Sequence, residues 1–121
     1  MDPTKYTDKQ LIFGSGGGFT NQVSEYRLLE DSRLFYRKNN DSSFTELKKQ
    51  DVKTTKRLLE DAKALFEDVP ELNEPGNVYY YIKLKNANNT QQIVWGRANT
   101  EVPEKAKDLY KQLMNLVHLN H

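Results

Sequence analysis

Cysteine is absent from the sequence, and histidine is nearly so. The lack of cysteine excludes disulfides, iron–sulfur clusters, thiolate metal sites and thiol catalysis, and it leaves the redox compartment open. The two histidines, His118 and His121, both lie at the C-terminal end, with no convincing further ligands beside them. A Ser-His-Asp arrangement or a histidine metal site would depend on these terminal residues. We therefore expect no metal site, no cofactor and no hydrolysis of that type.

A dominant charge and long apolar runs are missing as well. Eighteen basic and seventeen acidic side chains are interspersed along the chain and give a formal net charge of +1. Without a positive field we expect no nucleic-acid partner, and without an apolar run of membrane-spanning length we expect no membrane insertion. The first residues contain no apolar targeting core. The sequence thus predicts a soluble protein, cytoplasmic or exported after removal of a signal segment.

Large aromatic side chains are plentiful, with seven Tyr, five Phe and one Trp in 121 residues. A chain of this length that contains so much apolar ring surface is expected to fold as one domain around one core. The pattern predicts a flexible lead-in over residues 1–8, a single domain over 9–118 and a frayed end over 119–121.

Alternating apolar and polar residues predict strands and hairpins in both halves of the chain. A strand is expected over 9–13, a hairpin over 20–38 with Asp31-Ser32 as its turn, and a short strand over 44–48. A two-residue loop at Asp31-Ser32 would place Leu28 opposite Phe35. Residues 71–76 are expected to form a loop.

A second hairpin is expected over 77–96, around a four-residue loop at 86–89. This register pairs Ile82 with Ile93 and Tyr80 with Trp95 on the face that is expected to form the core.

Helical spacing of apolar residues appears twice. Asp51 is expected to cap the first helix and Pro103 to lie in the first turn of the second. The buried stripes are expected to be Val52, Leu58, Leu59, Ala62, Leu65 and Phe66, then Ala106, Leu109, Tyr110, Leu113, Met114 and Val117. The fold class that follows is α+β, in the order strands, helix, strands, helix. We expect an antiparallel sheet of two main hairpins with both amphipathic helices packed on one face.

Four of the six glycines fall within the stretch Gly14-Ser15-Gly16-Gly17-Gly18-Phe19-Thr20. Such a glycine-rich loop meets one of two needs: a bend or bulge between strands, or bare backbone that a ligand or another chain approaches closely. A phosphate loop is disfavoured because no Gly-Lys-Ser/Thr opens a helix here. For the ligand interpretation, the candidate binding residues are Gly16, Gly17, Gly18, Thr20 and Arg97.

Three residues of the second hairpin, Tyr79, Tyr81 and Val94, share the sheet face opposite the predicted core. Because two helices on one side leave the other side open, these residues are expected to form an outward aromatic set rimmed by Lys83 and Gln92. Such a set would suit a sugar, a peptide or a dimer contact. The alternative is a small second core beneath the N-terminal segment or the loop over 67–76.

Several motifs together resemble a family of small, uncharacterised bacterial α+β domains. They are Phe13 to Thr20, then Tyr26, Leu28 and Leu29, then Asn73 to Asn77 before Tyr79-Tyr80, and then Ile93-Val94-Trp95-Gly96. The resemblance covers about residues 9–117 and implies no known activity. Hairpin turns in that family usually carry Asn-Gly or Asp-Gly, whereas this chain has Asp31-Ser32.

The function expected from these observations is non-enzymatic binding, through the outward sheet face or the glycine-rich bend. The alternatives are a small enzyme that uses carboxylates and Arg97 around residues 16–20, and an accessory domain of a larger assembly. The expected partner is a protein or a small ligand, and the expected state is a monomer or a weak dimer.

Overall fold

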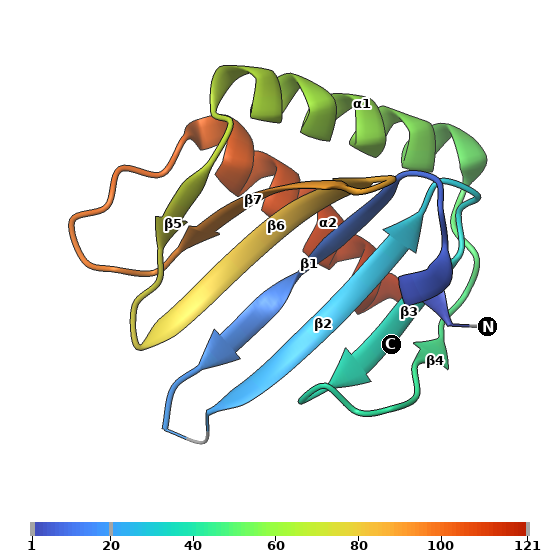
Figure 1. Ribbon diagram of the computed structural model, residues 1–121, viewed down its shortest axis with the longest axis horizontal. Coiled ribbons are helices and arrows are strands. Elements are labelled where there is room, and N and C mark those ends of the chain that lie inside the picture. The colour runs from blue at the N-terminus through green and yellow to red at the C-terminus, as the bar shows by residue number, and fades with distance from the viewer. Residues whose placement is uncertain (1, 20, 121) are drawn as a thin grey trace.

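The computed structural model describes residues 2–19 and 21–120, with side chains through residue 118. Its fold is α+β, as the sequence predicts: a sheet with two helices on one of its faces (Figure 1). In the view of Figure 1, α2 lies behind the sheet, so the opposite face is turned to the reader. We call this opposite face the outer face.

The elements follow the chain in a simple order. A short 3-10 helix, η1 (Pro3–Lys5), precedes β1 (Gln10–Gly17), β2 (Gln22–Leu29), β3 (Leu34–Lys38) and β4 (Thr45–Glu46). Then come α1 (Val52–Asp68), β5 (Leu72–Glu74), β6 (Val78–Asn86), β7 (Asn89–Trp95) and α2 (Glu104–Asn120). The strand order across the sheet is β4-β3-β2-β1-β6-β7-β5.

The sheet differs from the predicted pair of hairpins in extent and in direction. It has seven strands over the described residues, and it is mixed because β5 pairs in parallel with β7. The prediction of a loop over 71–76 is therefore wrong at Leu72–Glu74. The predicted first strand, 9–13, is also too short, since β1 continues to Gly17 and joins the two halves by pairing with both β2 and β6.

The turn between β2 and β3 is one residue longer than predicted. Ser32 has a φ of 79°, and the N–H of Leu29 donates to the carbonyl of Arg33 at 2.9 Å. A three-residue loop with a left-handed last residue is a common hairpin connection. Leu28 consequently lies opposite Leu34 instead of Phe35.

The predicted register of β6 and β7 is confirmed, because Ile82 lies opposite Ile93 and Tyr80 opposite Trp95. The loop is shorter than predicted, since pairing continues to Asn86 and Asn89.

Both helices begin close to the predicted residues. The Asp51 side chain accepts a hydrogen bond from the N–H of Thr54 at 2.9 Å, which caps α1, and the carbonyl of Pro103 accepts from the N–H of Ala106 at the start of α2. The stripe of α1 is buried except for Val52, which is 65% exposed. On α2, Tyr110 and Met114 are only partly buried.

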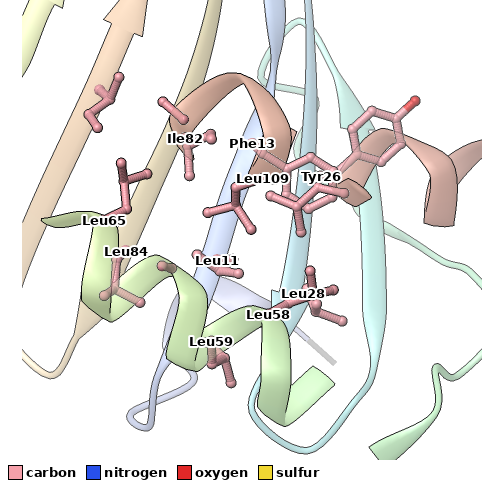
Figure 2. Close-up of a cluster of buried hydrophobic side chains, with 14 of the residues drawn as sticks. Leu11, Phe13, Tyr26, Leu28, Leu58, Leu59, Leu65, Ile82, Leu84 and Leu109 are labelled. Carbon is pink, nitrogen blue, oxygen red and sulfur yellow. The ribbon is translucent and has the colours of Figure 1, made fainter. Parts of the chain in front are cut away.

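One main core lies between the helices and the sheet (Figure 2). Strands β1, β2 and β6 present alternate residues to it, among them Leu11, Phe13, Leu28 and Ile82. Because α1 and α2 contribute to this same cluster, both helices pack on one face of the sheet.

The segment for which the sequence predicts a flexible lead-in, residues 1–8, contains η1, whose Pro3 is buried. The Gln10 side-chain amide donates to the Pro3 carbonyl at 3.1 Å, and the Lys85 ammonium donates to the Thr4 carbonyl at 3.3 Å. Within the part of the chain that the structure describes, neither helix is long and apolar enough to span a membrane.

Candidate functional site

The C-terminal half of the central strand β1 has no side chains on the outer face. Leu11 and Phe13 enter the main core, so Ile12, Gly14 and Gly16 point the other way. Gly14 and Gly16 carry no Cβ, which leaves bare backbone in the middle of the sheet.

Two tyrosines of the neighbouring strand occupy the space above these glycines. Gly14 lies opposite Tyr81 of β6, and Gly16 lies opposite Tyr79. A Cβ built on Gly16 would lie only 2.6 Å from Cζ of Tyr79, and one on Gly14 would lie 2.9 Å from the Tyr81 hydroxyl and overlap the carbonyl oxygen of Ser24. The groups that approach this stretch closely in the structure are therefore aromatic rings of the same chain, whereas the approach considered from the sequence was that of a ligand or another chain.

Two tyrosine hydroxyl groups donate hydrogen bonds at or beside Gly14, one on each face of the sheet. On the outer face, the Tyr81 hydroxyl crosses β1 and donates to the carbonyl of Ser24 on β2 at 2.8 Å. On the helix face, the Tyr110 hydroxyl of α2 donates to the carbonyl of Gly14 at 3.0 Å. Gly14 thus lies beneath the Tyr81 hydroxyl and accepts a hydrogen bond from helix α2.

Burial extends the pH range over which both hydroxyl groups stay protonated. Desolvation raises the pKa of Tyr81 above its usual value, and it raises the pKa of Tyr110 to about 12. Both phenols therefore remain hydrogen-bond donors well into the alkaline range.

A depression of about 280 Å³ lies on the outer face. Its lining comes from β1, β2, β6, β7 and the loop after β3: Ile12, Val23, Glu25, Arg27, Asn40, Tyr79, Tyr81, Lys83 and Val94. Ile12, Tyr81 and Val94 form a small second hydrophobic cluster, against which Tyr79 packs. We call this hollow, together with the residues that line it, the outer-face depression.

The predicted outward residues are less exposed than expected. Tyr81 is 6% and Val94 8% exposed, so these two residues form a floor instead of protruding, whereas Tyr79 is half-buried. The reason is the missing side chains of Gly14 and Gly16, which let the rings lie low over β1.

An ion-pair network borders the depression. Glu25 accepts from Nε of Arg27 through Oε2 at 2.6 Å, and from Nε of Arg37 through Oε1 at 3.2 Å. The Phe44 ring lies against both guanidinium groups. The guanidinium carbon Cζ of Arg37 is 4.4 Å from the centre of the ring, and that of Arg27 is 5.6 Å from it. Arg27 also donates from Nη1 to the Gln10 side chain at 3.1 Å.

Sequence reasoning missed this network because of the register of β2 and β3. Glu25 lies directly opposite Arg37, but the predicted two-residue loop would have shifted the pairing by one residue. Opposite charges that face each other across a strand pair were the signal that could have revealed the network.

In the part of the glycine-rich bend that the structure describes, contacts within the chain already occupy some of the backbone. Gly17 and Gly18 have φ angles of 83° and 81° and turn the chain, which fits the bend interpretation at these two positions. The Gly18 N–H already donates to the Asn77 carbonyl at 2.7 Å, so it is not available to a ligand. Gly16 lies beneath Tyr79, and Thr20 lies outside the described residues.

Arg97, the remaining candidate ligand residue, forms an ion pair with Glu74 at 2.6 Å, beside β5. His118 is exposed near the end of α2, and His121 lies outside the described residues. Among the described residues, no group of three or more His, Asp or Glu side chains is arranged to hold a metal ion.

No protein-family model matches the sequence, and a search of curated proteins finds no match. The resemblance to small bacterial α+β domains therefore stays a prediction.

The substitution Gly14→Ala is expected to destabilise the fold far more than Gly18→Ala. The new Cβ at residue 14 would overlap the backbone of β2 and displace the Tyr81 hydroxyl, at a cost of about 3–4 kcal/mol. At residue 18 the nearest atom is a methyl group of Val78 at 3.5 Å, so only the left-handed backbone opposes alanine, at about 1 kcal/mol. Urea unfolding of both variants measures the difference, and equal costs would contradict the account.

Stability is expected to fall at alkaline pH, in part through Tyr110. Its pKa in the folded state is about 12, above the unfolded value of about 10, so its contribution is complete below pH ~10 and is lost as pH rises through ~12. Tyr110→Phe removes this contribution. Its urea midpoint should therefore drop less between pH 8 and pH 11 than that of the wild type; an equal drop would show that Tyr110 carries no such linkage.

Proposed function

We propose that this protein is a non-enzymatic binding domain that takes an extended segment of a protein partner in the outer-face depression. The observation that carries the proposal is the combination of an apolar floor and a charged rim on the sheet face opposite both helices. Ile12, Tyr81 and Val94 form the floor, and Glu25, Arg27 and Lys83 lie around it. An apolar centre with a polar rim is the usual anatomy of a protein interface.

The size of the depression favours a protein segment over a small molecule. Its volume of about 280 Å³ lies just below the roughly 300–1,000 Å³ of pockets that bury most of a small ligand. A segment laid across β1 and β6 would use the open surface without being enclosed.

The floor is rigid before any partner arrives, which supports the proposal energetically. The Tyr81 ring is held by its hydrogen bond to Ser24 and by packing over Gly14, and Tyr79 packs beside it with ring centroids 6.4 Å apart. Side chains that are already ordered lose little conformational entropy on binding.

The alternative of a small enzyme at residues 16–20 receives less support. A catalytic acid there would call for a carboxyl group with a raised pKa. The carboxyl groups whose pKa values are shifted are Asp2, Asp31 and Asp51, and all three are shifted downwards. An accessory domain of a larger assembly would use the same outer face, and we propose a monomer or weak dimer as the free state.

The proposal is tested by amide NMR titration against separate pools of extended peptides, sugars, nucleotides and metal ions. We expect the peptide pool to shift the amides of Ile12, Val23 and Val94. Val23→Trp, which fills the depression without adding charge, should weaken this binding at least ten-fold, whereas Ala64→Trp on exposed α1 should leave it unchanged. Shifts centred on residues 16–18 and Arg97, or equal binding by both variants, would contradict the proposal.

A further inference from the structure

Two of the three charged side chains that line the outer-face depression are cations. Arg27 and Lys83 line it together with Glu25, which gives the lining a net charge of +1, and Arg37 adjoins it through its ion pair with Glu25. Cations therefore outnumber carboxylates on this small surface.

The one carboxylate of this group, Glu25, is already paired with two arginines. Its Oε2 accepts from Arg27 and its Oε1 from Arg37, and the side chains of all three residues are less than a fifth exposed. Hydrogen bonds from two guanidinium groups hold this carboxylate in place, so it is not free to neutralise another cation.

Lys83 is the cation that remains without an anion. It lies on the outer side of β6, and its ammonium nitrogen is 5.4 Å from the centre of the Tyr81 ring. Within residues 2–19 and 21–118, no carboxylate forms an ion pair with Lys83. The ring offers the ammonium group only a weak cation–π contact.

We infer that the segment bound in the outer-face depression is acidic, and that Lys83, supported by Arg27, pairs with one of its carboxylates. This inference rests on the proposed function and names the chemistry of the partner. The apolar residues beside this carboxylate in the bound segment would lie on Ile12 and Val94, while the carboxylate itself would form an ion pair with Lys83. Complementary charge of this kind fixes the orientation of a segment and speeds its association.

A single-stranded nucleic acid would supply anions too, but the rings do not suit it. Base stacking needs exposed aromatic faces, and Tyr81 is only 6% exposed. A strand of phosphates would also need a longer row of cations than Arg27 and Lys83 provide. The acidic peptide is therefore the better match.

The test uses defined probes on the full chain. Hexaglutamate, hexaglutamine and hexathymidylate are titrated separately while the amide NMR spectrum is followed. We expect hexaglutamate to shift the amides around Ile12, Lys83 and Val94, and hexaglutamine to bind at least ten-fold more weakly. Equal binding of the two peptides, no shifts with hexaglutamate, or tighter binding of hexathymidylate would overturn the inference.

Two lysines of one strand provide the matched variants. Lys83→Gln removes the unpaired cation, and Lys85→Gln removes the same charge two residues away on the same face, where the lysine contacts Thr4 outside the depression. Lys83→Gln should weaken hexaglutamate binding about three- to ten-fold, the range expected for the net contribution of one ordinary hydrogen bond, and Lys85→Gln less than two-fold. Equal effects would indicate diffuse attraction and overturn the inference.

The failure of this inference can be told apart from the failure of the proposed function. If peptides of the general pool still shift Ile12, Val23 and Val94 and still lose binding in Val23→Trp, while Lys83→Gln behaves like the wild type, only the acidic partner is wrong. If hexaglutamate and the pool both shift residues away from the outer face, both conclusions are wrong.

Discussion

The contact between the bare backbone of β1 and the tyrosine rings of β6 is the constraint on which the outer half of this structure depends. A sheet covered by helices on one side can leave its other side to solvent. Here, aromatic rings that lie low over Gly14 and Gly16 cover the middle of the outer face. Side chains at those two positions would lift the rings and open the small cluster of Ile12, Tyr81 and Val94.

The same contact connects the two faces of the sheet. Gly14 receives the Tyr110 hydroxyl from the helix side and lies beneath the Tyr81 hydroxyl on the outer side. Helix α2, the central strand and the outer-face depression are consequently linked through one residue. A partner on the outer face would meet a floor whose rings are fixed by packing and hydrogen bonds, with the charged groups of β2 and β6 standing around it.

Features that depend on local periodicity could be predicted from the sequence. The stripes of α1 and α2, the cap at Asp51 and the pairing of Ile82 with Ile93 needed only spacing and turn length. Features that depend on a distant partner could not. The three-residue loop that ends at Ser32, with its positive φ, shifts the β2–β3 register by one residue from the predicted one, so the sequence did not predict that Glu25 lies opposite Arg37. The residues near Gly14 in the sequence also did not indicate that Tyr81 would cover it.

The most direct test of the central contact is a double-mutant cycle between Gly16→Ala and Tyr79→Ser, followed by the free energy of unfolding. The three atoms nearest to a Cβ at residue 16 all belong to the Tyr79 side chain. We expect Gly16→Ala to cost about 1–3 kcal/mol beside Tyr79 and to be neutral or slightly stabilising beside serine. Costs that add within about 0.5 kcal/mol would show that glycine is not there to receive the ring.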